Sequence, residues 1–404
     1  MLFNDSHNAS NNMNILNHIY YLGVNDRKKH LFENNWPLPQ GVAYNSYLIA
    51  DRHTALIDTL EYGSCPDYLA RIDAILEGRR LEYLIVNHME PDHASMIGEI
   101  LRVYPNIKIV GNNKTAKMIE AYFAPQKPIM EVADGEELNL GYHRLKFVMT
   151  PWVHWPETMM TYDLSDQVLF SCDAFGSFGS LDGGIFDDEI DFERFYEDEM
   201  LRYYANIVGK YSNMVQKAFA KLAGVPLSCI CPSHGPIWRK EPLKVVGLYD
   251  KWSKQQAEPG LVVAFASMYG NTEVVADHLA RQAAEAGLKH IRVYDVSKTH
   301  VSYILRDIWK YKGLLLGSCA YNSGMHPMMQ QLCHELEVAA PKNKAVGLFG
   351  SYSWSGGGLR SLQAFAANMG WEEAAAPVEI PGAPNAKKLE TCEALAKAVA
   401  HLSL

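Results

Sequence analysis

The decapeptide VNHMEPDHAS at residues 86–95 decides the fold of this 404-residue chain, because it places two histidines and two acids directly after an apolar strand. These residues are His88, Glu90, Asp92 and His93. A rigid strand that ends in a loop can turn several side chains toward one metal ion. The chain has 15 histidines and 46 acidic residues, so chance would give this pattern in about one such chain in a hundred. The pattern therefore indicates a metal site.

Three further segments each offer one more ligand at the end of an apolar strand. They are His154 in TPWVHWPET, Asp173 in LFSCDAFGS and His234 in CICPSHGP. Any one of them alone could be a hydrogen-bonded loop residue. Four imidazoles and three carboxylates together exceed what one tetrahedral ion takes, so the sequence predicts two metal ions with one bridging carboxylate.

The spacing and strand context resemble the metallo-β-lactamase superfamily, whose usual motif is HxHxDH. Here Glu90 stands where most hydrolytic members carry a second histidine, and the resulting HxExDH pattern is similar to the flavodiiron branch. A carboxylate is a harder donor than imidazole and favours iron over zinc. The resemblance implies one iron held by His88, Glu90 and His154, and a second held by Asp92, His93 and His234, with Asp173 bridging the two.

Two neighbouring segments also resemble the flavodiiron family, FGSFGSLDGGIFDDE at residues 175–189 and MLRYYANIVGKY at residues 200–211. Tyr203 and Tyr204 in the second segment are either ordinary core aromatics or, for one of them, a hydrogen-bond donor to a metal-bound ligand. The sequence leaves both alternatives open.

The length of the chain favours two domains, because single cores stop growing near about 250–300 residues. The polar segment KQQAEPG at residues 254–260 is typical of a linker, and we expect domains at residues 1–257 and 258–404. The first resembles the metallo-β-lactamase αββα sandwich. Its expected strands are 43–49, 54–58, 83–87, 108–111, 145–149 and 168–172, and its main expected helices are 94–103 and 192–222.

After residue 260 the pattern changes to alternating strands and helices, which predicts a doubly wound parallel sheet. The expected strands are 261–266, 291–296, 313–317 and 345–350. The expected helices are 272–286, 327–338, 358–368 and 386–400. This part resembles a flavodoxin.

The first loop of this second domain, SMYGNT at residues 267–272, opens a helix whose backbone amides and dipole suit a phosphate. The motif is neither a P-loop nor a dinucleotide fingerprint, and a simple helix cap is the alternative. It resembles the flavodoxin phosphate loop, which implies FMN. Two later strand ends, GSCAYNSG and GSYSWSGGG, complete the expected FMN contacts, which are Ser267, Met268, Tyr269, Gly270, Asn271, Thr272, Ala320, Tyr321, Asn322, Gly324, Ser351, Tyr352, Ser353, Trp354 and Gly356.

Trp354 and Tyr321 are either the two flanks of the isoalloxazine ring or exposed loop aromatics. Cys319 and Ala320 stand where relatives often carry Pro-Thr, so one hydroxyl contact to the flavin is expected to be missing and the reduction potential is left open.

The resemblance implies an enzyme that reduces dioxygen to water or nitric oxide to nitrous oxide, with a slight preference for dioxygen on family grounds. Electrons would come from a rubredoxin-type donor through FMN, in a head-to-tail homodimer or homotetramer. A binuclear zinc hydrolase with an added flavodoxin module is the main alternative. A flavin electron carrier with a decayed metal domain is a third.

Charge and cysteine usage limit the other possibilities. The net charge is −9 and no basic stripe is present, which argues against nucleic acid as a partner. The N-terminal segment lacks the pattern of a secretory signal and no long apolar run occurs, so we expect a cytoplasmic protein without membrane spans. The seven cysteines form no CxxC pair, which fits reduced thiols and excludes a rubredoxin module within this chain.

Overall fold

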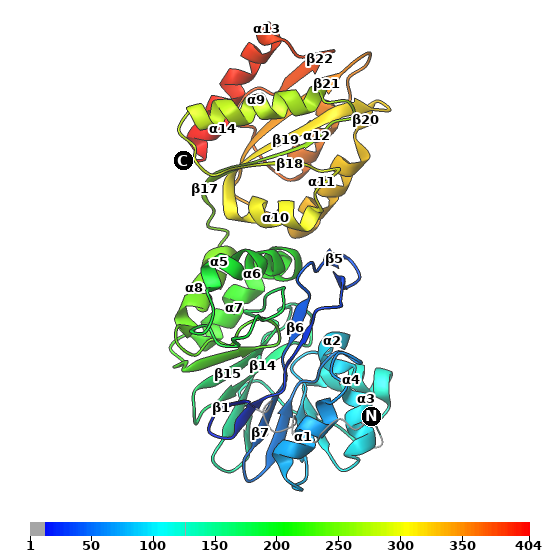
Figure 1. Ribbon diagram of the computed structural model, residues 1–404, viewed down its shortest axis with the longest axis vertical. Helices are drawn as coiled ribbons and strands as arrows, with labels where there is room; N and C mark the ends of the chain where they lie inside the picture. Colours follow the sequence, from blue (N-terminus) through cyan, green and yellow to red (C-terminus); the bar gives the residue numbers. More distant parts are fainter. Residues whose placement is uncertain (1–12, 126) are drawn as a thin grey trace, which may run out of the picture. The chain divides into compact units, whose positions relative to one another are not determined.

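The computed structural model describes residues 13–125 and 127–404 (Figure 1). Residues 1–12, on which the expectation of no secretory signal mainly rests, lie outside the described part. The chain divides into two compact units, an N-terminal unit of residues up to 204 together with 211–253, and a C-terminal unit of residues 205–210 together with 254–404. The main division falls at the start of the segment 254–260.

The N-terminal unit contains two sheets with helices on their outer sides (Figure 1). The seven-stranded sheet runs in the order β1 (Met13–Leu16), β2 (Ile19–Tyr21), β7 (Tyr47–Ala50), β8 (Thr54–Ile57), β9 (Tyr83–Ile85), β10 (Lys108–Gly111) and β11 (Met130–Glu131). The five-stranded sheet runs in the order β12 (Glu137–Asn139), β13 (Arg144–Met149), β14 (Met159–Asp163), β15 (Val168–Cys172) and β16 (Cys229–Pro232). Two short hairpins pair β3 (Val24–Asp26) with β6 (Val42–Tyr44), and β4 (Leu31–Phe32) with β5 (Trp36–Pro37).

Helices cover both sheets, which gives the expected αββα sandwich. They are α1 (Tyr68–Leu76), α2 (Pro91–Ala94), α3 (Ile97–Val103), α4 (Asn113–Phe123), α5 (Phe192–Phe195), α6 (Glu197–Tyr203), α7 (Ser212–Leu222) and α8 (Pro242–Ser253). Every residue of β7, β8, β14, β15 and β16 is buried. Strands covered on both faces usually read as continuous apolar runs, which β7 and β16 illustrate, whereas β14 also buries Thr161 and Asp163.

Three expected elements of the N-terminal unit are interrupted. The expected strand 43–49 is wrong, because Asn45 and Ser46 separate β6 from β7 and the two strands join different sheets. Of the expected helix 94–103, only Ala94 belongs to α2, Ser95 and Met96 interrupt the helix, and α3 covers the remainder. The expected helix 192–222 is divided into α5, α6, a π-helical turn at Tyr204–Val208, a 3-10 turn at Gly209–Tyr211, and α7.

The C-terminal unit is a doubly wound sheet in the strand order β18-β17-β19-β21-β22, which is flavodoxin-like. Its parallel strands are β17 (Glu258–Ala266), β18 (Ile291–Asp295), β19 (Tyr311–Tyr321), β21 (Ala345–Tyr352) and β22 (Val378–Pro381), and the short β20 (Gly324–Met325) pairs antiparallel with β19. The helices are α9 (Asn271–Glu285), α10 (Val301–Lys310), α11 (Pro327–Ala339), α12 (Gly358–Asn368), α13 (Ala386–Leu389) and α14 (Glu393–Leu402). Strand β17 already begins inside the expected linker.

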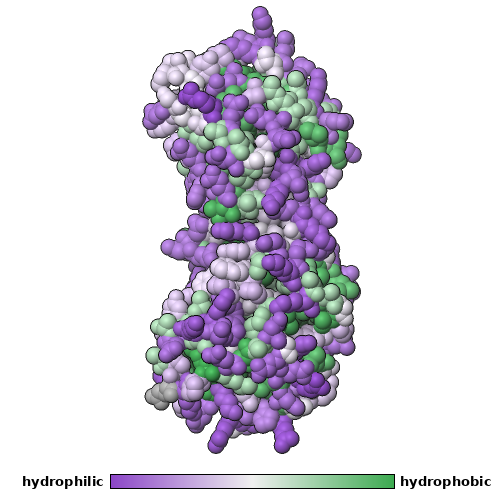
Figure 2. Space-filling model, turned by 180° about the vertical axis from the view of Figure 1, so that it is seen from behind, coloured by the Kyte–Doolittle hydropathy of each residue, from purple (hydrophilic) through white to green (hydrophobic). Residues whose placement is uncertain are grey.

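Helix α10 lies between the expected strands 291–296 and 313–317, where no helix was predicted from the sequence. It buries Val301, Ile304, Leu305 and Ile308, and this spacing is the ordinary signal of an amphipathic helix. The expected final helix 386–400 is broken by a 3-10 turn at Glu390–Cys392. Among the described helices, none has the length and apolar character needed to span a membrane. Figure 2 shows hydrophilic residues interspersed with small hydrophobic patches on one face.

Candidate metal centre and flavin site

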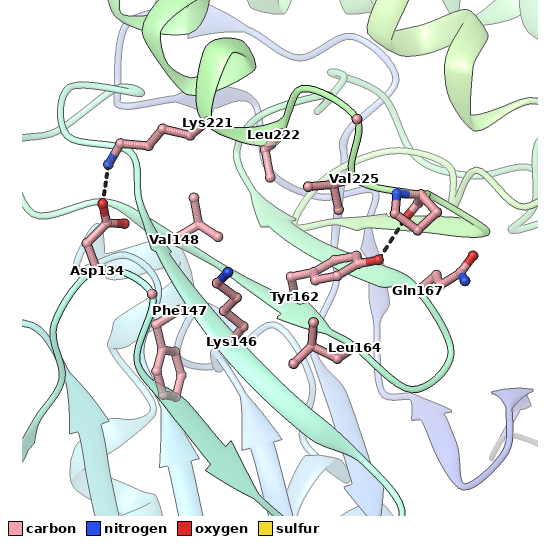
Figure 3. Close-up of a pocket in the computed structure, with 13 residues that line it drawn as sticks. Asp134, Lys146, Phe147, Val148, Tyr162, Leu164, Gln167, Lys221, Leu222 and Val225 are labelled. Carbon is pink, nitrogen blue, oxygen red and sulfur yellow. Dashed lines mark hydrogen bonds and ion pairs between the residues drawn. The ribbon is translucent and has the colours of Figure 1, made fainter.

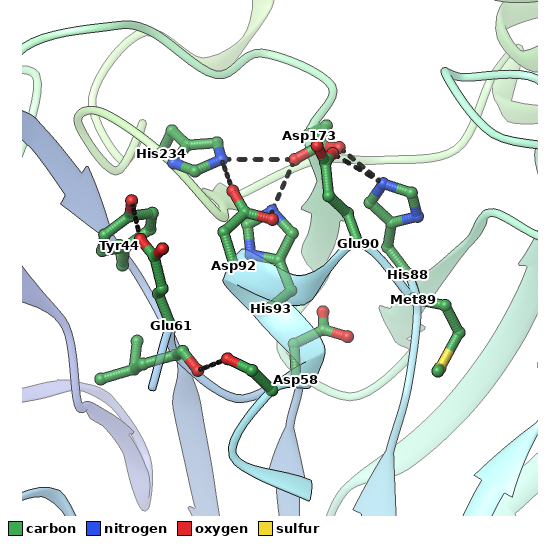
Figure 4. A network of polar contacts seen from close by, with 12 residues as sticks. Tyr44, Asp58, Glu61, His88, Met89, Glu90, Asp92, His93, Asp173 and His234 are labelled. Carbon is green, nitrogen blue, oxygen red and sulfur yellow. Dashed lines mark hydrogen bonds and ion pairs between the residues drawn. The ribbon is translucent and has the colours of Figure 1, made fainter. Parts of the chain in front are cut away.

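The predicted ligand motif follows β9 directly. The chain turns into α2 at Pro91, whose ring already fixes the φ angle that a first helical residue needs. The amide of His93 donates to the carbonyl of Glu90 at 2.9 Å and closes the turn. As a result, the side chains of Glu90, Asp92 and His93 are turned toward Asp173 (Figure 4).

One group of ligand atoms consists of His88, Glu90, His154 and one oxygen of Asp173. The His88 Nε2 atom lies 3.3 Å from Glu90 Oε2 and 3.2 Å from Asp173 Oδ2. The His154 Nε2 atom lies 3.0 Å and 3.2 Å from the same two oxygens. All four side chains are buried.

The second group consists of Asp92, His93, His234 and the other oxygen of Asp173. The His93 Nε2 atom lies 2.9 Å from Asp173 Oδ1 and 3.4 Å from Asp92 Oδ1. The His234 Nε2 atom lies 3.2 Å from Asp92 Oδ2 and 3.5 Å from Asp173 Oδ1. Asp173 thus turns one oxygen to each group, which is the arrangement of a bridging carboxylate (Figure 4).

The spacing and the unsatisfied atoms of this cluster fit metal ions. Ligand atoms that share an ion at about 2.1 Å lie about 3.0–3.4 Å apart, and the eight separations above fall close to that range. A closed hydrogen-bond network would satisfy all of its buried atoms. Among the described residues, however, both Asp92 oxygens, Asp173 Oδ2 and His234 Nε2 are buried without a hydrogen-bond partner. Two coordinated ions would satisfy them.

The outer nitrogens of two histidines are fixed by acceptors. The Nδ1 atom of His88 lies 2.7 Å from Glu157 Oε1, and that of His234 lies 2.9 Å from the carbonyl of Ala43. A carbonyl only accepts, so Nδ1 of His234 carries the proton and Nε2 keeps a lone pair for a metal. Glu157 was not predicted to contact a ligand, although it stands only three residues after His154 in WVHWPET.

The carboxylates of the cluster raise the pKa values of His93 and His154. Burial lowers the pKa of His93, but the charges of Asp92 and Asp173 outweigh it and raise that pKa to about 9. Burial also lowers the pKa of His154, and the hydrogen bond with Asp173 leads the effects that raise it to about 9. Metal ions therefore compete with protons for these nitrogens, and metal binding should release protons.

The loop that carries His234 is held by Asn45. Its side-chain amide donates to the carbonyls of Pro232 and Gly235, each at 2.9 Å. Its backbone amide donates to the carbonyl of Ser233 at 2.8 Å. The residue that interrupts the expected strand 43–49 is therefore the residue that positions one of the predicted ligands.

The two tyrosines of the MLRYYANIVGKY segment have different surroundings. The Tyr203 ring centre lies 5.6 Å from that of His234, and its buried hydroxyl has no hydrogen-bond partner among the described residues. The Tyr204 hydroxyl lies 2.9 Å from Ser212 Oγ, and its ring packs against Tyr249. Of the two, Tyr203 has the position that the hypothesis of a donor to a metal-bound ligand requires.

A separate cavity of about 510 Å³ lies beside β13 and β14 (Figure 3). It contains none of the seven predicted ligands. Lys221 pairs there with Asp134 at 2.8 Å, and the Tyr162 hydroxyl donates to the carbonyl of Pro226 at 2.6 Å. The predicted metal ligands are thus packed inside the unit and do not line this open cavity.

In the C-terminal unit, the loop after β17 has the features of a phosphate site. Gly270 precedes α9 with a φ angle of 92°, and its amide donates to Ser267 Oγ at 3.0 Å. No side chain caps α9, and the amides of a first helical turn have no partner inside the helix. Thr272 Oγ1 lies 2.8 Å from Ser351 Oγ, which joins this loop to the loop after β21.

The predicted flavin contacts lie at the carboxyl ends of the adjacent strands β17, β19 and β21 and in the segments that directly follow them. Trp354 is 80% exposed and Tyr321 is 41% exposed, so both rings are accessible to a flat ligand. At the same three strand ends lie Met268, Tyr269, Asn271, Ala320, Asn322, Gly324, Tyr352, Ser353 and Gly356. These loops, with the uncapped helix, fit a flavin carrying one phosphate.

Comparison with known families agrees with this division of the chain. A model described as "ODP family beta lactamase" matches residues 42–235, which include all seven predicted metal ligands. A model described as "Flavodoxin" matches residues 263–395, which include all three predicted flavin loops.

Known relatives match both units together. The chain is 31% identical to an anaerobic nitric oxide reductase flavorubredoxin of Pectobacterium carotovorum, over 96% of this chain and 78% of that protein. The structure of rubredoxin oxygen:oxidoreductase from Desulfovibrio gigas matches with a TM-score of 0.92 and 29% identity, over 97% of this chain and 98% of that one. A flavo di-iron protein mutant from Thermotoga maritima matches with a TM-score of 0.88 and 27% identity, with 96% of each chain covered. The chain belongs to the flavodiiron protein family.

Proposed function

We propose that this protein reduces dioxygen or nitric oxide at two iron ions that receive electrons from FMN. The observation that carries the proposal is the geometry of Asp173. Its two oxygens face two different histidine pairs, with the closest nitrogen on each side at 3.2 Å and 2.9 Å. Relatives named as reductases of oxygen and of nitric oxide support the same reaction class.

The chain's own residues would hold the two ions and keep the site closed to bulk water. His88, Glu90 and His154 would bind one ion, Asp92, His93 and His234 would bind the other, and Asp173 would bridge them. Bound iron would supply the redox changes and the open coordination position. The fixed Nδ1 protons of His88 and His234 orient their rings, and the Tyr203 hydroxyl is free to donate a hydrogen bond into the site.

Glu90 is the reason to prefer reduction of a gas at two irons over the second candidate function, a binuclear zinc hydrolase. The two activities differ in metal content and in substrate. Two zinc ions with esterase or lactamase activity would favour the hydrolase. A flavin carrier with a decayed metal domain is disfavoured, because all seven ligand positions are filled and turned toward each other.

FMN is proposed as the entry point for electrons, with a rubredoxin-type protein as the donor. The names of the relatives from D. gigas and P. carotovorum support that donor class. We further propose a head-to-tail homodimer or homotetramer, in which FMN of one subunit serves the iron pair of another. All seven cysteines are free thiols, which suits the proposed cytoplasmic location.

The test begins with iron and FMN content of the purified protein. The protein is then reduced anaerobically and exposed to dioxygen or to nitric oxide in separate experiments. We expect about two irons and one FMN per chain, and rapid reoxidation by at least one gas. Absence of iron, or reoxidation no faster than that of free reduced FMN, would contradict the proposal. Comparing the two rates decides the preferred substrate.

A further inference from the structure

Glu379 lies beside the proposed flavin site but was not among the expected contacts. It belongs to β22 and pairs with Gly350 of β21. A Cβ atom on Gly350 would lie 3.6 Å from Glu379 Cγ, so the Glu379 side chain runs at van der Waals distance beside this residue. The Glu379 carboxylate lies beside the loop after β21. A Cβ atom on Gly356 in that loop would lie 3.1 Å from Oε2 and 3.4 Å from Oε1.

The Glu379 carboxylate has an unsatisfied buried atom. Among the described residues, Oε1 is buried without a hydrogen-bond partner. Such an atom destabilises the folded protein, and more so when it is charged. Its position next to Gly356 puts the negative charge close to the start of α12, which has no side-chain cap. Negative charge is favourable at a helix N-terminus, so the start of α12 stabilises the charge of the Glu379 carboxylate.

The same loop is confined from its other side. Gly357 has a φ angle of 149°, and a Cβ atom there would lie only 2.2 Å from the carbonyl oxygen of Ser323. The loop that carries Trp354 therefore passes between Glu379 and the segment after β19 that contains Ser323. Because Trp354 is 80% exposed, its position depends on the backbone at this narrow passage.

We propose that Glu379 positions the Trp354 loop for FMN and that its negative charge weakens the binding of reduced FMN relative to oxidised FMN. Reduced flavin carries more negative charge than oxidised flavin, and like charges repel most strongly where water is excluded. Removal of the charge should therefore raise the reduction potential of the flavin. This inference rests on the proposed binding of FMN.

The test uses the complete protein and compares Glu379→Gln with wild type. Glutamine keeps the size of the side chain and removes its charge. The dissociation constant of oxidised FMN and the potentials of bound FMN are measured by anaerobic titration. The dissociation constant of reduced FMN is divided by that of oxidised FMN, and we expect this ratio to be about threefold to tenfold lower in Glu379→Gln than in wild type. A tenfold change in that ratio equals a shift of about 30 mV in the two-electron reduction potential of the bound flavin.

Glu373→Gln is the matched control. Glu373 Oε2 is also buried without a hydrogen-bond partner among the described residues, but Glu373 bridges to Val346 near the other end of β21. The four residues from Val346 to Gly350 place it about 13 Å further along the strand. The same loss of charge at this position should leave the FMN potentials unchanged.

The outcomes separate this inference from the proposed function. Wild-type protein that binds no FMN overturns both. Wild-type protein that binds FMN, with equal potentials in wild type and Glu379→Gln, overturns this inference alone, and so does an equal shift in Glu373→Gln. If Glu379→Gln does not fold, Glu379→Asp serves instead. It keeps the charge but shortens the reach to the loop, so it should weaken the binding of oxidised FMN, and unaltered binding overturns the positioning role.

Discussion

Replacement of Glu157 by alanine should destabilise the protein and loosen one of the two proposed irons. Glu157 is 1% exposed, and its Oε1 atom accepts from His88 Nδ1 at 2.7 Å and from the Met89 amide at 3.0 Å. Alanine leaves both donors buried without an acceptor. Each unsatisfied donor costs about 1–3 kcal/mol, so the free energy of unfolding should fall by about 2–6 kcal/mol.

The effect on metal should be confined to the group that contains His88. Loss of the residue that orients a ligating histidine typically costs about 10–100-fold in metal affinity. Chelator challenge of Glu157→Ala should therefore remove about one iron per chain much earlier than the other, whereas wild type should lose both slowly. Denaturant unfolding measures the stability change on the same samples.

Glu82→Ala is the matched control, because Glu82 also pairs with a histidine. The His53 Nδ1 atom lies 3.0 Å from its carboxylate, but the two side chains are 42% and 36% exposed. This change should cost less than about 1 kcal/mol and leave the iron content unchanged. If Glu157→Ala unfolds within about 1 kcal/mol of wild type and holds both irons as tightly, the role assigned to Glu157 is wrong.

Three further predictions, one of them with a control variant, have defined outcomes. His143 pairs through Nδ1 with Asp163 at 2.9 Å, and although burial lowers its pKa, this carboxylate raises it overall. His143→Gln should therefore lose about 1.5–3 kcal/mol of unfolding free energy below pH 6, and the difference from wild type should shrink as the pH rises through the raised pKa, because only its charge-dependent part is lost, as measured by denaturation at several pH values. Tyr203→Phe should slow gas-dependent turnover severalfold, whereas Tyr204→Phe should leave turnover unchanged and cost about 1 kcal/mol of stability. Trp354→Ala should weaken FMN binding about twofold to tenfold, which fluorescence titration measures.

The sequence could indicate where the candidate metal ligands come together because part of the signal is local. His88, Glu90, Asp92 and His93 follow one apolar strand within six residues, and such a motif restricts the fold around it. The alternating strands after residue 260 predicted the doubly wound sheet for the same reason, since each strand and helix is a continuous pattern. Helix α10 carries an equally local signal, because its buried residues Val301, Ile304, Leu305 and Ile308 recur at helical spacing.

Other features depend on contacts between distant parts of the chain. Asn45 interrupts an apolar run because its side chain bonds to the loop around His234, 187–190 residues away. Glu157 and His88 are 69 residues apart. The local sequence pattern around one residue of such a pair does not indicate that the other residue contacts it. The break in the expected strand and the residue that orients His88 therefore became visible only when the two sheets were packed together.

Charge balance explains how so many ionisable groups can be buried in one place. Two divalent ions would bring four positive charges, and Glu90, Asp92, Asp173 and Glu157 bring four negative ones. Without metal, the raised pKa values of His93 and His154 let protons take over part of that positive charge. A histidine at position 90, as in the HxHxDH pattern of hydrolytic relatives, would leave the metal-bound cluster one negative charge short. Glu90 therefore matters for charge as well as for metal preference, and iron in its more oxidised state increases that need.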